Sequence, residues 1–366
     1  MNSRLGHLLR KSAAVVLAGA AALYALAPAP QALAQAKKEV VLVASGGALA
    51  NAFKTHFFDD FTKQTGIAVR FVPAADAEML TKVKAMNESG KVEWDIVAAN
   101  LDQIAAFNQF FAPLDCKTLA HAATDGIPGA CDSYSVLKQL DGNVLVYNTK
   151  KFPASGPQPA SWADFWDVKK FPGPRSLPDH GAPWVVIAAA LMADGVPAAQ
   201  IKAPLDLDRA FKKLDQIKPH VTVWWKTGDQ STQSVRDGVV DLSMMYSGRA
   251  LRAESMGAPI HSTWNQAVMA PGRWTVLKGA PHPEEAKAFL DFFFTRPEAH
   301  AAFTQEIFYD TVNKNSVNFL PAGDRPNSAL YGDNLSKTVM LDYDLADWLG
   351  KHHDEILERW NSWIAH

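Results

Sequence analysis

Short apolar runs alternate with amphipathic stretches from the first third of the chain onward. Residues 40–43 are all apolar and predict a buried strand, which ends at Ser45-Gly46-Gly47. Four phenylalanines then recur at three- and four-residue steps between positions 53 and 61, which is typical of one face of a helix. Gly66 can end this helix in a left-handed conformation. The pattern therefore predicts a strand, a tight turn and a helix.

The same alternation continues through most of the chain. It predicts further strands at 68–72, 94–98, 143–147, 221–225, 242–246 and 274–277. It predicts helices around 79–86, after Asp102, after Ser161 and at 184–192, 207–217, 283–295, 297–307 and 345–364. Strands that alternate with helices indicate an α/β fold with doubly wound, mainly parallel sheets. We expect 143–147 and 274–277 to cross between two lobes.

The length and composition agree with a globular protein that has two lobes. The chain has 366 residues, of which 48% are apolar and 20% charged. Its first 34 residues are different: three basic residues precede an apolar run, and Ala32-Leu33-Ala34 resembles a signal-peptidase site. We expect residues 1–34 to be a signal peptide that is cleaved near Ala34. The mature chain would then be soluble and exported.

The charge balance argues against a nucleic-acid partner. The full chain has a formal net charge of −2, and loss of Arg4, Arg10 and Lys11 with the leader changes it to −5. Nucleic-acid-binding proteins are usually basic, whereas this chain is mildly acidic. The longest later apolar run, 182–193, is interrupted by Pro183 and predicts a buried helix rather than a membrane span.

The two cysteines, Cys116 and Cys131, lie in a loop rich in glycine and proline. An oxidising compartment favours a disulfide between them. Two free thiols or half of a metal site are the alternatives, but the chain has no C-x-x-C motif. We predict the disulfide.

The motifs of several enzyme classes are missing from the sequence. It contains no G-x-x-x-x-G-K-[ST], H-E-x-x-H or G-x-S-x-G segment. His352 and His353 are adjacent on a predicted helix and point in different directions, so they form a poor metal pair. We expect no catalytic residues, no metal and no cofactor.

Five segments in order resemble one family of proteins. They are Asp60-Phe61-Thr62-Lys63-Gln64-Thr65-Gly66-Ile67, Trp94-Asp95-Ile96-Val97, Ser161-Trp162-Ala163-Asp164-Phe165-Trp166, Met244-Met245-Tyr246-Ser247-Gly248-Arg249 and Leu277-Lys278-Gly279-Ala280-Pro281-His282-Pro283-Glu284-Glu285-Ala286. In these segments the chain resembles periplasmic solute-binding proteins of bacterial ABC importers, of the type II fold, and is similar to the spermidine/putrescine-binding proteins. The resemblance covers nearly the whole mature chain.

The resemblance implies a two-lobed periplasmic binding protein. Each lobe would be an α/β domain, and the lobes would close around a small molecule. We expect the first lobe to contain 35–142 and about 273–318, and the second to contain 143–272 and about 319–366. Proteins of this family have no catalytic residues and deliver the solute to a membrane permease, so we expect a monomer whose partner is a permease.

The chain departs from the polyamine-binding pattern at two places. Where those proteins commonly have an aromatic residue after the first strand, this chain has Ser45-Gly46-Gly47-Ala48. Their acidic residue before the return crossing corresponds to Arg273 here. A guanidinium can hold a carboxylate with two parallel hydrogen bonds. We therefore expect a small carboxylate ligand, with a polyamine or another amine as the alternative.

The predicted ligand-binding residues come from both lobes. They are Ser45, Gly46, Gly47, Asn100, Trp184, Trp224, Gln230, Tyr246, Arg249, Arg273 and Trp274. Each also has a structural interpretation: Arg273 and Arg249 could form ion pairs, and at least one of Trp224 and Trp225 should be core. If the ligand is an amine, Asp179 is the acidic residue that would bind it.

Overall fold

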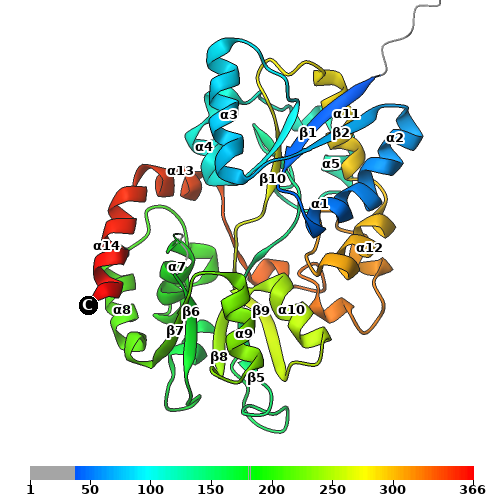
Figure 1. The fold of residues 1–366 in the computed structure, drawn as a ribbon. Coiled ribbons are helices and arrows are strands. Elements are labelled where there is room, and N and C mark those ends of the chain that lie inside the picture. Colours follow the sequence, from blue (N-terminus) through cyan, green and yellow to red (C-terminus); the bar gives the residue numbers. More distant parts are fainter. Residues whose placement is uncertain (1–37, 180, 182) are drawn as a thin grey trace, which may run out of the picture. The chain divides into compact units, whose positions relative to one another are not determined.

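The computed structural model describes residues 38–179, 181 and 183–366. The predicted signal peptide, residues 1–34, lies outside the described residues. In the part that is described, α-helices alternate with β-strands along the chain, and the strands form two sheets (Figure 1). The α/β fold with two lobes is therefore confirmed. No helix among the described residues is long and apolar enough to cross a membrane.

The first sheet has five strands in the order β2-β1-β3-β10-β4. These strands are β1 (Glu39–Ala44), β2 (Ala68–Pro73), β3 (Ile96–Ala99), β4 (Ser135–Leu137) and β10 (Arg273–Val276). The first three are parallel, whereas β10 runs antiparallel to both β3 and β4. The predicted strand at 40–43 is the fully buried part of β1, because helices cover both faces of the sheet.

Helices of the first lobe come from two distant parts of the sequence. They are α1 (Ala48–Phe53), α2 (Asp59–Thr65), α3 (Asp76–Ser89), α4 (Leu101–Ala106), α5 (Ala120–Thr124), α11 (Pro283–Phe293) and α12 (Pro297–Ile307). A π-helical turn joins α1 to α2, and Gly66 ends α2 with φ +75° as predicted. The phenylalanine face packs on α11: the ring centroids of Phe57 and Phe293 are 4.7 Å apart.

The second sheet has six strands in the order β11-β9-β5-β8-β6-β7. They are β5 (Gly142–Asn148), β6 (Arg175–Pro178), β7 (Val221–Trp225), β8 (Leu242–Tyr246), β9 (Ile260–Met269) and β11 (Val339–Met340). The sequence analysis missed β4 of the first sheet and β6, β11 and β9 of the second. The longest of these is β9. Its residues include His261, Asn265 and Gln266, and much of the strand is only half-buried, so it shows no apolar run.

Five helices belong with the second sheet. They are α6 (Trp162–Trp166), α7 (Trp184–Ala193), α8 (Leu207–Ile217), α9 (Gly228–Arg236) and α10 (Ser247–Ser255). Every residue of α7 is buried, which confirms the buried helix predicted from its apolar composition. Ser161 caps α6 as predicted, because its hydroxyl oxygen accepts a hydrogen bond from the backbone N–H of Asp164.

The chain crosses between the two sheets just outside the segments that were predicted to cross. β5 pairs only within the second sheet and β10 only within the first, among the described strands. Two crossings are short, residues 138–141 between β4 and β5 and residues 270–272 between β9 and β10, and a longer one leads from α12 to β11. The prediction was wrong in this detail because an apolar run indicates a strand but not its partners.

The C-terminal segment forms two helices rather than the single helix predicted at 345–364. These are α13 (Tyr343–Lys351) and α14 (His353–Ala365). α13 packs against α4 (Figure 1). Just after α4, the Asn108 side-chain amide donates to the Tyr343 hydroxyl at 3.1 Å. The ring of Trp360 on α14 lies 6.5 Å from that of Phe211 on α8. The C-terminal segment thus contacts a helix of the first lobe through α13 and a helix of the second through α14. The lobe boundaries along the chain remain a prediction.

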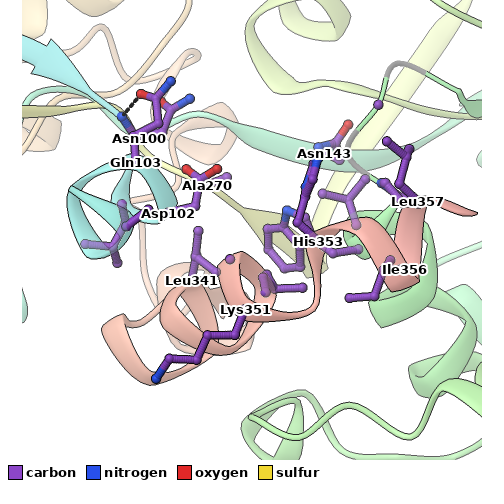
Figure 2. Close-up of a pocket in the computed structure, with 18 of the residues that line it drawn as sticks. Asn100, Asp102, Gln103, Asn143, Ala270, Leu341, Lys351, His353, Ile356 and Leu357 are labelled. Carbon is purple, nitrogen blue, oxygen red and sulfur yellow. Dashed lines mark hydrogen bonds between the residues drawn. The ribbon is translucent and has the colours of Figure 1, made fainter. Parts of the chain in front are cut away.

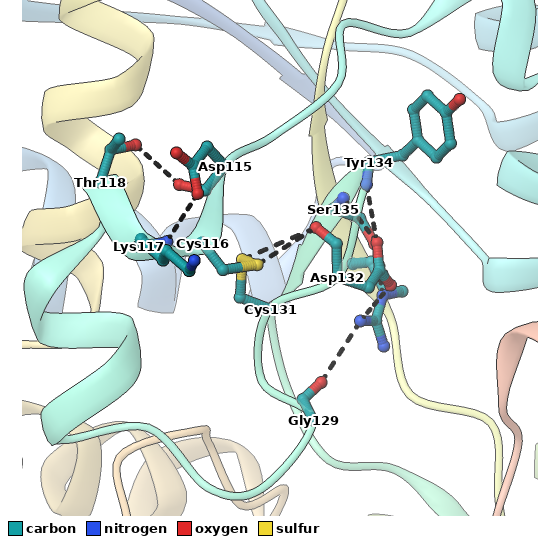
Figure 3. Close-up of a disulfide and its surroundings, with 10 residues drawn as sticks. Asp115, Cys116, Lys117, Thr118, Gly129, Cys131, Asp132, Tyr134 and Ser135 are labelled. Carbon is teal, nitrogen blue, oxygen red and sulfur yellow. Dashed lines mark hydrogen bonds and ion pairs between the residues drawn. A yellow bond between two sulfur atoms is a disulfide. The ribbon is translucent and has the colours of Figure 1, made fainter.

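The predicted disulfide is confirmed. The sulfur atoms of Cys116 and Cys131 are 2.08 Å apart and close a loop between residues 15 apart in sequence (Figure 3). Asp132 follows the second cysteine, and its carboxylate accepts hydrogen bonds from the backbone N–H groups of Tyr134 and Ser135. The bridge and this carboxylate together fix the segment that leads into β4.

Replacing both cysteines by serine should lower the free energy of unfolding by about 3 kcal/mol, because an open loop gains conformational entropy in the unfolded chain. Urea denaturation of the variant and of the wild type measures the difference. Dithiothreitol should destabilise the wild type and leave the double variant unchanged. Equal stability of the two proteins under oxidising conditions would contradict this role of the bridge.

Candidate functional site

The ends of three strands meet where a ligand would be expected in an open α/β sheet. β2 and β3 lie on opposite sides of β1, so the strand order reverses there, and ligands collect at the carboxyl ends of strands beside such a reversal. Ser45 follows β1, Asn100 follows β3 and Tyr246 ends β8 of the second sheet. These three residues line a common cavity of about 420 Å³.

This cavity is the smaller of two adjoining cavities and is called the smaller cavity below. Its walls come from both sheets and from the two short crossing segments. Its polar and aromatic lining includes Ser45, Phe53, Asn100, Gln103, Lys138, Gln139, Asp141, Tyr246, Arg249, Trp274 and Tyr309. Five residues predicted from the sequence are among them: Ser45, Asn100, Tyr246, Arg249 and Trp274. Their contact with a ligand stays a prediction.

Two cations face the smaller cavity. The ammonium group of Lys138 lies 5.1 Å from the centre of the Trp274 ring and 5.9 Å from that of Phe53, and its side chain is buried. Arg249 is half-exposed and its guanidinium contacts the Asp229 carboxylate at 2.5 Å. A Cβ atom on Gly228 would lie 2.2 Å from Arg249 Nε, so the glycine allows the guanidinium to lie against the backbone. A carboxylate in this cavity would meet positive charge.

The carboxylate of Asp141 lines the same cavity as these two cations. Asp141 lies at the end of the first crossing, and its Oδ1 accepts a hydrogen bond of 3.3 Å from the Gly272 backbone N–H. Burial raises the pKa of Asp141 to about 6, and the charge of Lys138 opposes this rise. Since a nearby cation stabilises the ionised carboxyl group, an ammonium group bound here would lower that pKa again. Asp141 is therefore suited to bind an amine.

Two buried polar atoms in the wall lack hydrogen-bond partners among the described residues. They are Nε1 of Trp274, which can only donate, and Oε1 of Gln139, which can only accept. Both side chains are at least 94% buried, and both line the smaller cavity. An unsatisfied buried polar group costs about 1–3 kcal/mol. A ligand or water that offers both an acceptor and a donor would remove this cost.

Two phenols complete the wall. Burial raises the pKa of the Tyr309 hydroxyl above its usual value, and the Asp141 charge adds to the rise. Burial likewise raises the pKa of Tyr246. A Cβ on Gly248 would lie 2.6 Å from the Tyr309 ring, so this glycine makes room for it. Both tyrosines stay protonated at neutral pH and offer O–H groups rather than negative charge.

A larger cavity of about 710 Å³ adjoins the smaller one (Figure 2). Asn100, Gln103, Asp141 and Tyr246 line both cavities. The other walls come from α4, from the start of α7 and from the two C-terminal helices, and they include the predicted residue Trp184. Within α4, Gln103 Oε1 accepts a hydrogen bond of 2.9 Å from the Asn100 backbone N–H, which closes the start of the helix.

The structure gives Arg273 a different role from the predicted one. Its side chain is buried, its guanidinium contacts the Asp132 carboxylate at 2.6 Å, and its Nε donates to the Ser135 hydroxyl at 2.6 Å. Arg273 lies outside the residues that line the two cavities. The sequence showed a basic residue where the polyamine-binding proteins have an acid, but it did not show that Asp132, just before β4, is its ion-pair partner. The contacts of Arg273 are therefore structural ones within the first sheet.

Three other predicted residues also have structural partners away from both cavities. Asp179 accepts a hydrogen bond from Trp360 Nε1 at 2.9 Å, and the Lys226 ammonium lies 3.6 Å from its carboxylate. The Trp224 ring packs edge-on against Trp360, with centroids 5.8 Å apart. Gln230 closes the start of α9, where its Oε1 accepts from the Lys226 and Thr227 backbone N–H groups. These contacts remove Asp179, Trp224 and Gln230 from the predicted site.

The glycines of the first turn are structural as well. Gly47 has φ +91°, a conformation that residues with a side chain rarely adopt, and it precedes α1. Gly46 and Gly47 lie outside the residues that line the two cavities, whereas their neighbour Ser45 lines the smaller one. The two glycines therefore determine the course of the turn, and Ser45 is the residue of the turn that contributes to the cavity wall.

The sequence analysis missed the residues of the crossing segments. Lys138, Gln139 and Asp141 precede β5 directly, and Tyr309 follows α12. Polar residues between two apolar strands were a usable signal at 138–141, because a crossing in a two-lobed protein borders the space between the lobes. Tyr309 gave no such signal.

Metal ligands are not assembled in the part of the chain that the structure describes. No three His, Cys, Asp or Glu side chains among those residues lie together in a way that could hold a metal ion. His352 stacks on Trp348 with ring centroids 4.5 Å apart. The site chemistry rests on charged, amide and aromatic side chains.

Comparison with known sequences identifies a family. The model of the family described as bacterial extracellular solute-binding protein matches residues 56–326. The gamma-aminobutyric acid-binding protein of Pseudomonas aeruginosa is 32% identical over 94% of this chain and 95% of that protein. The spermidine/putrescine-binding periplasmic protein of Escherichia coli is 25% identical over 47% of this chain and 48% of that protein.

Comparison with solved structures agrees. The periplasmic binding protein AttC of Agrobacterium tumefaciens C58, in an open unliganded conformation, gives a TM-score of 0.80 at 32% identity, with 89% of this chain and 99% of that chain covered. The GABA receptor Atu4243 gives 0.74 at 32% identity, with 89% and 98% covered. An ABC transporter substrate-binding protein from Bradyrhizobium japonicum USDA 110 gives 0.75 at 34% identity, with 89% and 99% covered. The chain belongs to the bacterial extracellular solute-binding proteins and is a substrate-binding component of an ABC transporter.

Proposed function

We propose that this protein captures a small zwitterionic amino carboxylate, of the type of γ-aminobutyrate (GABA), between its two lobes. The observation that carries the proposal is the smaller cavity, where Lys138 and Arg249 stand beside Asp141. A ligand carboxylate would meet the two cations, and a ligand ammonium group would meet Asp141. The names of the relatives from Pseudomonas aeruginosa and of Atu4243 support this class of ligand.

The two unsatisfied buried atoms support both ends of such a ligand. The Trp274 N–H would donate to the carboxylate, and Gln139 Oε1 would accept from the ammonium group. A carboxylate alone leaves Gln139 Oε1 without a donor and brings no positive charge to Asp141. A diamine leaves Trp274 without an acceptor and brings positive charge to Lys138. A polyamine also loses the acidic residue assigned to it, because Asp179 already has partners elsewhere.

The protein would act in the periplasm as a monomer without catalysis. The predicted leader would direct export, and the lobes would close over the solute because the closed state binds it more tightly than the open state. A membrane permease would then receive the solute. Turnover of a bound compound would contradict this non-enzymatic role.

A thermal-shift panel of four-carbon compounds tests the ligand class. GABA at one hundred times its dissociation constant should stabilise the protein by about 2.7 kcal/mol. Butyrate has only the carboxylate, and butylamine and putrescine have only amines, so each should give a much smaller shift at the same concentration. A shift with putrescine and none with GABA would overturn the proposal in favour of an amine receptor.

A further inference from the structure

The larger cavity offers space that a GABA-sized ligand in the smaller cavity would not fill. The smaller cavity alone, at about 420 Å³, falls in the size range of small-molecule sites. The larger cavity adds about 710 Å³. The two cavities share four lining residues, Asn100, Gln103, Asp141 and Tyr246. A ligand whose ammonium end reaches Asp141 would therefore point its next atoms into the larger cavity.

The charged residues that line the larger cavity are mainly acidic. Asp102 on α4 and Asp354 and Glu355 on α14 lie at its exposed edge, and Asp141 lies at its junction with the smaller cavity. Lys351 also lines it, but its ammonium group contacts the Asp347 carboxylate at 2.6 Å. His353 is the remaining basic side chain among the described lining residues. This charge distribution favours a cation.

A buried acceptor in the wall points to the same kind of ligand. Asn143 on β5 is 3% exposed and lines the larger cavity, and its Oδ1 has no hydrogen-bond partner among the described residues (Figure 2). Such an oxygen requires a donor. Ammonium and guanidinium groups carry only donors, so either would satisfy it.

Apolar side chains line the stretch between these polar groups. They include Leu101, Ala106, Trp184, Val185, Leu349 and Ile356. Methylene groups of a ligand would be buried against them, and apolar burial adds to affinity. The two cavities together thus offer a cationic compartment, an acidic compartment and apolar walls.

We propose that the protein takes extended ω-amino and ω-guanidino acids, with the carboxylate in the smaller cavity and the donor-rich end in the larger one. This inference rests on the proposed function, since the carboxylate compartment is shared. It adds that Asn143 and the acidic edge select a donor group beyond the length of GABA. Asn143 is then a specificity-determining residue for the long ligands.

Calorimetric titration of the mature protein with 4-guanidinobutyrate, 6-aminohexanoate, GABA and hexanoate tests the inference. The guanidino and six-carbon amino acids should bind about tenfold more tightly than GABA, because they add a satisfied acceptor and buried methylene groups. Hexanoate, which has the length but no donor, should bind more weakly than 6-aminohexanoate by a similar factor. Long ligands that bind no better than GABA would overturn the inference.

Two variants locate the effect. Asn143→Leu keeps the branched shape of the side chain, removes the acceptor and should weaken 4-guanidinobutyrate about tenfold more than it weakens GABA. Because a buried substitution can disturb folding, Asp354→Asn at the exposed edge gives a second measurement and should weaken only the long cations, by about two- to fourfold. Equal losses for both ligands in each variant would contradict the inference. Failure of GABA and of all the amino acids to bind would instead contradict the proposed function.

Discussion

Replacing Arg273 by alanine should lower the free energy of unfolding by about 3–5 kcal/mol. The guanidinium is buried against the Asp132 carboxylate and donates to the Ser135 hydroxyl, so its removal leaves a carboxylate that has lost its opposite charge. Asp132 follows Cys131 and anchors the segment before β4, so the loss should extend to that segment. Urea denaturation of the ligand-free protein measures it.

The double variant Arg273→Met with Asp132→Asn is the matched control. It removes both charges and keeps most of the side-chain volume, so it should regain a large part of the lost stability. Both variants should still bind ligand at temperatures where they are folded, because Arg273 lies outside the cavity walls. A normal unfolding curve for Arg273→Ala together with lost ligand binding would return Arg273 to the binding site.

Replacing Asp141 by asparagine should weaken binding of GABA by roughly 30-fold to 1,000-fold, or about 2–4 kcal/mol. The substitution keeps the shape of the side chain and removes the negative charge that an ammonium group would meet. Calorimetric titration at pH 7.5 measures the change. The matched control is Asp179→Asn, whose carboxylate contacts Trp360 and Lys226 away from both cavities and whose loss should leave the affinity within about twofold.

The pH dependence of binding gives an independent readout of the same group. Burial raises the pKa of Asp141 to about 6 in the ligand-free protein, and a bound ammonium group favours the ionised carboxyl. Affinity for GABA should therefore hold above pH 7 and fall as the pH drops through 6, whereas Asp141→Asn should flatten this part of the profile. The contribution to folding has the opposite sign: the raised pKa costs stability at pH 7, and this cost shrinks as the pH falls below 6 and is gone only below the usual carboxyl pKa of 3.8. A flat wild-type binding profile between pH 5 and 7 would contradict the assignment.

Local patterns in the sequence were sufficient for most of the elements of the fold. The phenylalanine spacing predicted the first helix, the apolar composition of 184–192 predicted a buried helix, and Gly66 marked a helix end. In each case the residues that determine the structure are neighbours in the chain. The half-buried strand β9 was missed because its burial depends on β5, more than a hundred residues earlier.

The candidate site shows the same difference between features set by neighbouring residues and features set by distant ones. Ser45, Asn100 and Tyr246 could be predicted because each ends or follows an apolar strand, and the ends of parallel strands meet at one edge of a sheet. Resemblance to the polyamine-binding proteins suggested a ligand role for Arg273 and Asp179, and the structure gives both of them structural partners.

The sequence by itself determined most of the strands and helices, the disulfide and the family, because local spacing and composition carry that information. Only the tertiary structure decided which charges line the cavity. Lys138, Asp141 and Arg249 line one cavity although they lie far apart in the chain, whereas the segment before β4 places Asp132 against Arg273. The net charge of a binding site depends on which of its charged side chains form ion pairs within the protein, and the paired residues can lie far apart in the chain.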